Sequence, residues 1–267
     1  MPDRPPRLTD RRWFDAWLAA QPTAPADRWR AFQARDDLPA TTFAFAASAV
    51  YSSNIEGISV DLASFLRSKT RGGAPPRTRE EAEVTALEAA YAWARDHDPT
   101  EANGLEAHRR LSEHTLTEGR RGVYRTERMF VYGPMGIVYA AVEPEHVEHE
   151  MAAFYDDVQA LRLSDLSPNQ AVYHAALAHL VFAHIHPFAD GNGRAARLLE
   201  KWILADALGP TAWAIPSEHF YWTHRPDYYA ALRLGPTFYD LDYNAGGPSG
   251  DGATTFLSLL PSALDTD

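Results

Sequence analysis

The sequence predicts an all-α protein, a helical bundle with one small β-hairpin. Apolar residues recur at helical spacing in segment after segment, whereas strand-forming residues gather in one stretch near the middle of the chain. Hydrophobic residues make up 45% of the 267-residue chain, which is enough to build a sizeable core. We therefore expect either one large helical domain or such a domain with an N-terminal extension.

The N-terminal part of the chain is expected to form helices ahead of the main bundle. Helical periodicity predicts three of them: 11–20, 26–34 and 42–55. Gly57 follows the third helix and is a typical helix stop. The loop 71–76, with paired glycines and paired prolines, then separates these helices from the rest of the chain. The resulting prediction is an N-terminal helical extension at 1–78 and a core domain at 79–267.

The core domain is expected to be built from a second series of helices. Their predicted ranges are 80–96, 105–118, 147–161, 169–185, 194–208 and 254–260. The stretch 244–252 is rich in glycine and is expected to be a flexible loop before the last helix. The aromatic residues between 220 and 229 are expected to pack in the core.

One hairpin interrupts this series of helices. Two short runs of strand-forming residues, 128–132 and 137–141, flank the sequence Gly-Pro-Met-Gly at 133–136. Apolar runs that are separated by such turn residues are typical of two paired antiparallel strands. The sequence therefore predicts a β-hairpin at about 128–141.

The run 186–197 carries the strongest functional pattern in the chain. It reads His-Pro-Phe-Ala-Asp-Gly-Asn-Gly-Arg-Ala-Ala-Arg and lies in the turn between the predicted helices 169–185 and 194–208. Gly191 and Gly193 permit close backbone approach and positive φ, so the amides around Asn192 can point at one anion. The free N–H groups at the start of the next helix can bind the same anion, because they lie at the positive end of the helix dipole. A phosphate fits such a turn.

The charged residues of the run fit the same interpretation. Arg194 and Arg197 are expected on one face of the first turn, where a cation opposes the helix dipole at a cost of about 0.3 to 1 kcal/mol. That placement makes sense if a bound anion offsets the cost. Asp190 would repel a phosphate unless a divalent cation lay between them, and Mg²⁺ held by one carboxylate, phosphate oxygens and water is usual in nucleotide sites.

His186 is the candidate general base of the run. It is the only side chain there that can take up a proton near neutral pH. We expect the following Pro187 to hold it in an extended conformation.

The whole run resembles the signature of the Fic family, which has the Fido fold. That signature is written H-P-F-x-[D/E]-G-N-G-R-x-x-R, and this chain matches it at every specified position. The order of the predicted elements resembles the family over roughly 80–229. Fic enzymes usually transfer the AMP part of ATP to a Ser, Thr or Tyr hydroxyl of a protein and release pyrophosphate.

The resemblance implies a role for each residue of the signature. His186 would deprotonate the target hydroxyl, and Asp190 would hold Mg²⁺ between the α and β phosphates of ATP. Phe188 would be an inward anchor of the loop. The implied nucleotide-binding residues are Gly191, Asn192 and Gly193, which form an anion hole, and Arg194 and Arg197, which bind the β and γ phosphates.

A second, shorter motif lies at the end of the predicted helix 42–55. Ser52, Glu56 and Gly57 fit the pattern [S/T]-x-x-x-E-[G/N] of inhibitory helices in Fic proteins. By this resemblance, Glu56 would pair with Arg197 and block productive seating of the γ phosphate. The hairpin 128–141 likewise resembles the Fic flap that docks the target backbone by strand pairing. A single proline, Pro144, follows it here, whereas many relatives have a proline-rich segment.

Charge and composition exclude several classes of function. The formal net charge of −11 argues against a general nucleic-acid binder, because phosphate backbones attract cationic surfaces. The chain has no cysteine, so disulfide and thiol chemistry are excluded. The sequence shows no signal peptide and no apolar stretch of membrane-spanning length, so we expect a cytoplasmic protein that does not act at a membrane. The oligomeric state stays open, homo-oligomers included.

Several functional alternatives also stay open. Within enzymes, Glu56 could instead position a water that removes AMP from the target, or the transferred group could be another nucleotide or phosphate moiety. A nonenzymatic protein that uses its nucleotide pocket as a regulatory module is an alternative of another class. The intact His186 favours an enzyme, because a binding module needs no base beside a phosphate site. The target protein is not encoded in these patterns.

Overall fold

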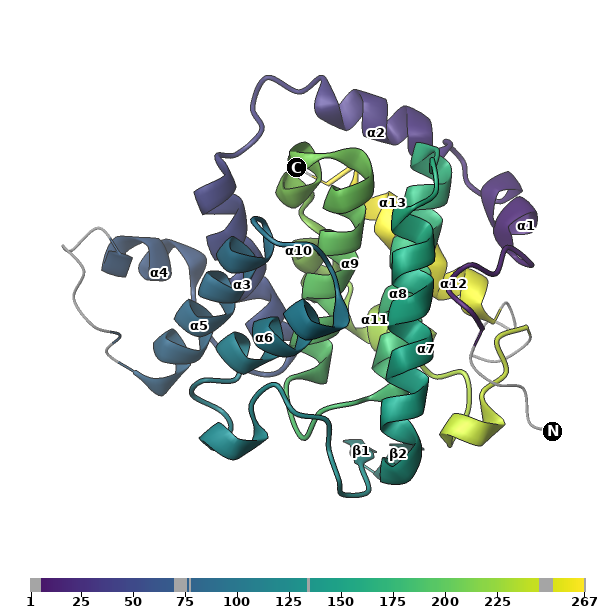
Figure 1. Cartoon of the computed structure of the whole chain (residues 1–267). Coiled ribbons are helices and arrows are strands. Elements are labelled where there is room, and N and C mark those ends of the chain that lie inside the picture. The colour runs from purple at the N-terminus through teal and green to yellow at the C-terminus, as the bar shows by residue number, and fades with distance from the viewer. Residues whose placement is uncertain (1–5, 70–75, 77, 134, 245–251, 267) are drawn as a thin grey trace.

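The computed structural model describes residues 6–69, 76, 78–133, 135–244 and 252–266 and shows the expected helical bundle with one hairpin (Figure 1). The α-helices are α1 (Phe14–Ala19), α2 (Pro25–Gln33), α3 (Thr41–Ile55), α4 (Leu62–Lys69), α5 (Arg79–Ala94), α6 (Glu101–Leu111), α7 (Pro144–Arg162), α8 (Pro168–Ile185), α9 (Asn192–Leu208), α10 (Ser217–Thr223), α11 (Arg225–Ala231), α12 (Ala253–Leu257) and α13 (Leu259–Ala263). Short 3₁₀ turns lie at Glu118–Arg120, Pro210–Ala214 and Phe238–Asp240.

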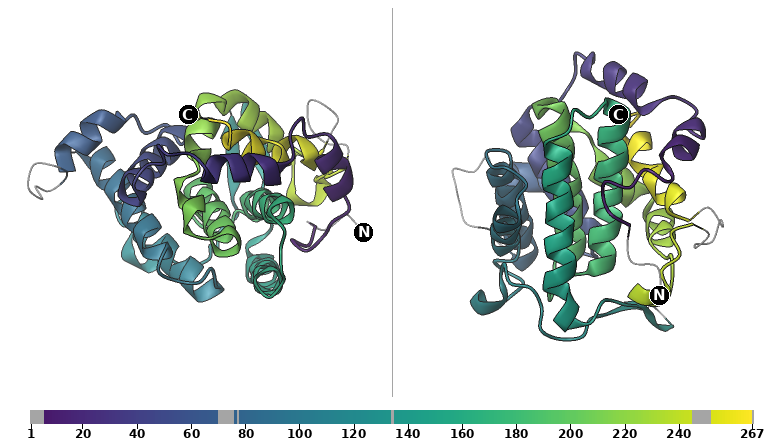
Figure 2. Two further views of the ribbon diagram at one scale, coloured as in Figure 1. Left: turned by 90° about the horizontal axis from the view of Figure 1, so that it is seen from above. Right: turned by 45° about the vertical axis from the view of Figure 1, so that its right-hand side comes forward.

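Helices α8 and α9 form the centre of the bundle. Most residues of α8 are buried, as expected for a helix that is apolar on all sides. It contacts α1, α2, α7, α9, α12 and α13, and the two views of Figure 2 show it among these neighbours. Ser167 and Gln170 form a capping box at its start, with Pro168 in the first turn.

The N-terminal segments share the core of the remaining chain. Trp17 of α1 is fully buried, and its ring lies 5.3 Å from that of Tyr173 on α8. Ala26, at the start of α2, donates its backbone N–H to the side-chain oxygen of Asn169 in the first turn of α8 (2.7 Å). Segments before and after the expected boundary thus pack into one hydrophobic core. The division into 1–78 and 79–267 stays a prediction.

A buried polar network fixes α3 against α9 and α10. Lys201 of α9 binds Glu218 of α10 and donates to the Ser48 hydroxyl of α3 (2.7 Å). Tyr91 of α5 donates its hydroxyl to the other oxygen of Glu218 (2.7 Å). Lys201 and Glu218 are each 1% exposed in their side chains. Because buried charges without partners are costly, this network specifies where α3 lies.

Several observed elements differ from the expected ones. Helix α4 was not predicted; it is short, its first turn is capped by Asp61 at the N–H of Ser64, and its buried residue is Phe65. Helix α6 begins at Glu101 and ends at Leu111, so the predicted range 105–118 is too late at both ends. The expected helix 254–260 is divided into α12 and α13.

Two expected loops fall largely on undescribed residues. Of the loop 71–76, only Pro76 lies within the described residues, and of 244–252 only Asn244 and Gly252 do. Within the described residues, no helix combines the length and the apolar character needed to span a bilayer.

The predicted hairpin is confirmed. Strands β1 (Phe130–Gly133) and β2 (Gly136–Ala140) pair in antiparallel register, with Phe130 opposite Ala140. Tyr139 anchors the hairpin to the end of α8 by donating its hydroxyl to the backbone oxygen of His184 (2.7 Å). Tyr132 and Ile137 are 69% and 56% exposed. The hairpin therefore presents an apolar surface near the loop that follows α8 (Figure 1).

Candidate functional site

The loop between α8 and α9 begins with an unusual backbone conformation at His186. Its φ of 53° and ψ of 58° are left-handed, and among the described residues no other non-glycine has a positive φ. The extended conformation expected from Pro187 is therefore wrong. The reason is that α8 ends in a left-handed cap, in which the N–H of His186 donates to the backbone oxygen of Phe182 (3.0 Å). Such strained positions often serve functional sites.

The cap directs the imidazole of His186 so that one nitrogen is left for chemistry. Nδ1 lies 3.2 Å from the backbone oxygen of Ala183. Since that oxygen can only accept, the ring hydrogen belongs on Nδ1 and Nε2 keeps its lone pair. Burial lowers the pKa of His186, although the carboxylates of Glu56 and Asp190 act in the opposite direction. The ring is thereby held in its basic, neutral form.

Phe188 and Asn192 hold the loop from the inside. Phe188 is 2% exposed, as expected for an inward anchor. Asn192 accepts from the N–H of Phe188 and donates to the backbone oxygen of the same residue, both at 2.8 Å. Its side-chain amide is therefore occupied within the loop. The backbone N–H of Asn192 lies in the first turn of α9, among the N–H groups that have no partner within the helix.

His108 of α6 also holds the loop, and sequence patterns did not single it out. Its ring stacks on that of Phe188, with centroids 3.5 Å apart. Nδ1 accepts from the N–H of Gly122 (2.9 Å), so Nε2 carries the hydrogen and donates to the backbone oxygen of Asp190 (3.0 Å). Burial lowers the pKa of His108 to about 4.

The lowered pKa of His108 predicts a loss of stability in acid. Between the unfolded value of about 6.5 and the folded value of about 4, the unfolded chain binds more protons, so the free energy of unfolding decreases as pH falls. The contribution is at most about 1.4 kcal/mol per pH unit. Urea unfolding between pH 7 and pH 4 should show a shallower pH dependence for His108→Phe than for the wild type. The exposed-site variant His114→Phe should keep the wild-type slope; equal slopes for His108→Phe would contradict this role.

Arg125 is a second residue that the sequence patterns missed. Its side chain is buried, with 3% of the residue exposed. Its guanidinium donates to the backbone oxygens of His186 (2.7 Å), Glu127 (2.9 Å) and Val142 (2.6 Å). The backbone N–H of Arg125 donates to the backbone oxygen of Pro187 (2.9 Å). Arg125 thus ties the base of the hairpin to the backbone of the candidate base.

Replacing Arg125 should loosen this junction. Arg125→Lys retains the charge but cannot supply the planar fork of donors, so several buried carbonyls lose their partners. We expect the free energy of unfolding to fall by about 1 to 3 kcal/mol, measured by urea denaturation. Arg120→Lys, at an exposed ion pair with Glu127, is the matched control and should change stability little.

The N-terminal end of α9 gathers backbone N–H groups and a buried guanidinium. Gly191 has a φ of 79°, a conformation that glycine adopts readily, and it places the first N–H groups of α9 toward the loop. Arg194 is 3% exposed, yet its Nε and Nη1 atoms have no hydrogen-bond partner among the described residues. Its nearest carboxylates are those of Asp190 (3.5 Å) and Glu83 (3.7 Å). Unpartnered buried donors of this kind favour a bound anion.

Asp190 suits a metal that takes one protein ligand. Its side chain is 53% exposed, and one of its oxygens accepts from the N–H of Gly191 (2.6 Å). No cluster of three metal-ligating side chains is found among the described residues. The donors therefore fit Mg²⁺ bound jointly by a single carboxylate, phosphate oxygens and water, and not a cage made by protein alone.

Glu56, at the C-terminal end of α3, reaches the same end of α9. Its Oε1 accepts from Arg197 (2.6 Å), and Ser52 accepts from Arg197 through both its hydroxyl (2.9 Å) and its backbone oxygen (3.0 Å). A Cβ on Gly193 would lie 2.2 Å from Oε1, so only glycine permits this approach. Arg197 itself lies in the second turn of α9, one turn later than expected.

The electrostatics of Glu56 match its position. Burial acts to raise its pKa, but the positive field of Arg197 and Arg194 outweighs this, and the pKa lies below its ordinary value. The carboxylate therefore stays ionised at neutral pH. The structure brings all the predicted site residues together around one end of α9, including Ser52 and Glu56 from a distant part of the sequence.

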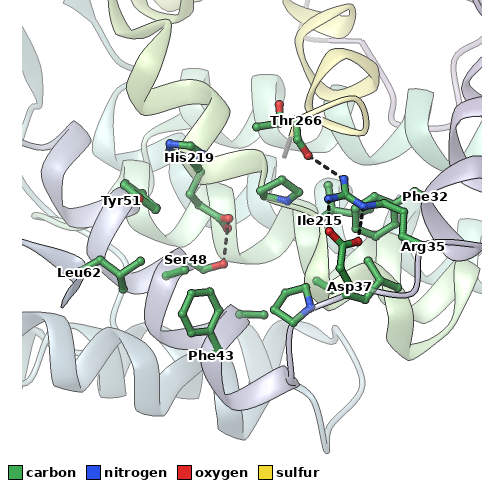
Figure 3. A pocket seen from close by; sticks show the side chains of 17 residues that line it. Phe32, Arg35, Asp37, Phe43, Ser48, Tyr51, Leu62, Ile215, His219 and Thr266 are labelled. Carbon is green, nitrogen blue, oxygen red and sulfur yellow. Dashed lines mark hydrogen bonds and ion pairs between the residues drawn. The ribbon is translucent and has the colours of Figure 1, made fainter. Parts of the chain in front are cut away.

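A separate cavity of about 360 Å³ lies on another face of α3 (Figure 3). Its walls come from the segment between α2 and α3, from α3 itself and from α10, and its lining includes Phe43, Tyr51 and His219. Ser48 and Glu218 of the buried network also border it. None of the predicted catalytic or phosphate-binding residues lines this cavity.

Comparisons with known families place residues 98–204 in the Fic/DOC family. Curated relatives include the protein adenylyltransferases Fic of Nematostella vectensis, 36% identical over 130 residues, and of Drosophila virilis, 37% identical over 133 residues. These alignments cover 48% and 49% of this chain but only 26% and 24% of the relatives. The chain thus spans about a quarter of the length of the curated relatives it matches.

Solved structures share the fold over nearly the whole chain. A Fic family protein from Desulfovibrio desulfuricans superposes with a TM-score of 0.73 at 22% identity, covering 98% of this chain and 74% of that one. A Fic domain containing signaling protein from Bacteroides thetaiotaomicron gives 0.63 at 20% identity, covering 97% and 92%. The fold expected from the sequence is confirmed.

Proposed function

We propose that this chain, whose residues 98–204 match the Fic/DOC family, transfers AMP from ATP to a Ser, Thr or Tyr hydroxyl of a target protein. The observation that carries the proposal is the free Nε2 of His186 beside the N-terminal end of α9. There, Arg194 keeps buried donors without partners. Nucleotide transfer requires a proton acceptor next to N–H donors that can bind phosphate oxygens.

In the proposed transfer, His186 accepts a proton while the donors at the start of α9 stabilise the phosphates. Nε2 of His186 takes the proton of the target hydroxyl as its oxygen attacks the α phosphorus of ATP. The bond between the α phosphorus and the bridging oxygen breaks, and pyrophosphate leaves. The N–H groups opening α9 and the guanidinium of Arg194 stabilise the phosphate charge, so the protein contributes mainly positioning and electrostatics. Asp190 would hold Mg²⁺, which supplies further charge neutralisation on the phosphates.

We further propose that Glu56 inhibits the resting enzyme. Its carboxylate occupies the space next to Gly193 and takes the guanidinium of Arg197, which the γ phosphate of ATP would otherwise bind. The close contact with Gly193 supports direct competition, because a phosphate oxygen and Oε1 would need the same space.

The flap made by β1 and β2 is the proposed docking site for the target. In the described residues β1 pairs only with β2, so its outer edge keeps free backbone groups for an added strand. The exposed side chains of Tyr132 and Ile137 would contact the target beside that edge. Tyr139 and Arg125 connect this surface to the loop that carries His186.

The proposal is tested by intact mass spectrometry of Glu56→Gly after incubation with Mg²⁺ and ATP, alone and in a cell lysate. An AMP-sized adduct on the protein itself or on a lysate protein is expected. Parallel reactions with GTP, CTP and UTP identify the transferred nucleotide. If ATP binds but no nucleotide is transferred, the nonenzymatic alternative replaces the proposal.

The rate of transfer should depend on pH through His186. Burial lowers its pKa below the ordinary value of 6.5, so the basic form already predominates at neutral pH. We expect kcat to be flat above pH 6.5 and to fall at lower pH, as the imidazole becomes protonated. Initial rates of Glu56→Gly from pH 4.5 to pH 8.5 provide the measurement. A rate that still rises steeply above pH 7 would contradict the lowered pKa.

A further inference from the structure

Arg197 is held from two opposite sides. On one side its partners belong to α3, namely Ser52 and Glu56. On the other side its Nη1 donates to the hydroxyl of Tyr228 on α11 (3.1 Å). The guanidinium is fully buried, so every one of these acceptors matters for its orientation. If the end of α3 that carries Glu56 moves away, Tyr228 can keep its contact with Arg197, because it belongs to α11.

A line of buried groups continues behind Tyr228. Its hydroxyl lies 3.0 Å from Nε2 of His179 on α8, and Nδ1 of His179 lies 2.8 Å from Oε2 of Glu200. Glu200 is on α9, three residues after Arg197. Tyr228 is 2% exposed, and His179 and Glu200 are 0% exposed. We name these three residues, Tyr228, His179 and Glu200, the buried relay.

The hydrogens of the relay can be assigned from its chemistry. A guanidinium only donates, so the oxygen of Tyr228 accepts from Arg197. The hydroxyl hydrogen is then directed to Nε2 of His179, and the hydrogen on Nδ1 is directed to Glu200. Every donor has an acceptor, and the line runs from the cation of Arg197 to a carboxylate. Burial raises the pKa of Tyr228, so its hydroxyl hydrogen is retained.

We propose that the buried relay positions Arg197 for the outer phosphates of ATP once Glu56 has been displaced. The inference rests on the proposed function, because it assigns Arg197 to a bound nucleotide. Tyr228 of the relay binds Nη1 of Arg197. Glu56 binds Nη2 in the resting state, so the loss of Glu56 makes Nη2 available to a phosphate oxygen.

The relay also stabilises the buried positive charge of Arg197. A buried guanidinium that loses its carboxylate partner is unfavourable until an anion replaces that partner. Glu200 supplies a negative end to the hydrogen-bonded line behind the guanidinium, and such lines strengthen each member through polarisation. The same arginine is therefore held in one orientation in both the resting and the nucleotide-bound states. Tyr228, His179 and Glu200 act through Arg197 and are positioning residues.

The test compares two buried hydroxyls that both lie near Glu200. Tyr228→Phe removes the contact with Arg197, whereas Tyr221→Phe removes a donor to Glu200 (2.9 Å) that does not reach Arg197. Both changes are made in the Glu56→Gly background, and binding of ATP and of AMP with Mg²⁺ is measured by titration calorimetry. We expect Tyr228→Phe to weaken ATP about tenfold and raise its KM similarly. AMP lacks the outer phosphates, so its affinity should be unchanged.

A second variant keeps the test valid if Tyr228→Phe does not fold. Glu200→Gln keeps the shape at the end of the relay but removes its charge, and should weaken ATP about threefold with AMP unaffected. Circular dichroism of each variant checks the fold. Equal ATP affinity for Tyr228→Phe and Tyr221→Phe, or a parallel loss of AMP, would overturn the relay. Failure of Glu56→Gly to bind ATP or to transfer AMP would instead refute the proposed function.

Discussion

Glu56→Gly is expected to raise the rate of AMP transfer by about 5- to 150-fold, the usual range for coupling between two competing states. The change removes the carboxylate that holds Arg197 and that lies against Gly193. ATP can then seat its outer phosphates on the freed guanidinium without first displacing an ion pair. Initial rates from intact mass, taken with excess Mg²⁺ and at an ATP concentration well below the wild-type KM, give the comparison with the wild type.

Two further variants separate the charge of Glu56 from its bulk. Glu56→Gln keeps the size of the side chain but lacks the charge, so it should fall between the wild type and Glu56→Gly. Glu113→Gly, at an exposed carboxylate distant from α3 in sequence, is the matched control and should leave the rate unchanged. A wild-type rate as high as that of Glu56→Gly would show that the ion pair with Arg197 does not inhibit.

His186→Ala in the Glu56→Gly background is expected to lower transfer by about 10²- to 10⁴-fold, the range for loss of a general base. The reason is that the free Nε2 is the proposed proton acceptor, while Nδ1 donates to the backbone oxygen of Ala183. ATP binding should persist, because the donors of α9 and Arg194 are untouched. Labelling from ATP and calorimetry on the same double variant separate chemistry from binding.

A second replacement controls for the backbone at position 186. The left-handed conformation there is strained for alanine, whereas asparagine tolerates it better. His186→Asn should therefore fold as the wild type does and still lack the base. If it retains most of the activity of Glu56→Gly, the role of His186 as a base is wrong.

The sequence was informative where the pattern is local. The helices flanking 186–197 follow from apolar periodicity, and the hairpin follows from its turn residues. Boundaries were harder. Helix α6 begins four residues earlier than predicted because Thr100 caps it (3.4 Å to the N–H of Asn103), although Gly104 is a poor helix former. Gly104 is suited to its place because a Cβ there would lie 1.9 Å from the hydroxyl of Tyr155.

Burial of polar side chains could not be predicted from the sequence. Arg125 and His108 resemble surface residues in the sequence, yet each lies in the interior and holds the backbone of the candidate site. Tyr228 was expected to pack in the core, and its hydroxyl also accepts from Arg197. Whether such a side chain is a solvated charge or an internal donor depends on which distant segments surround it.

The sequence by itself predicted the helical fold and the set of side chains around the turn 186–197, because these depend on local spacing and on a complete signature. Only the tertiary structure decided the left-handed cap that frees Nε2 of His186. It also decided the contact of Glu56 with Gly193 and the two-sided hold on Arg197. These features arise where α3, α8, α9 and α11 meet, and their chemistry depends on distances between residues that are far apart in the chain.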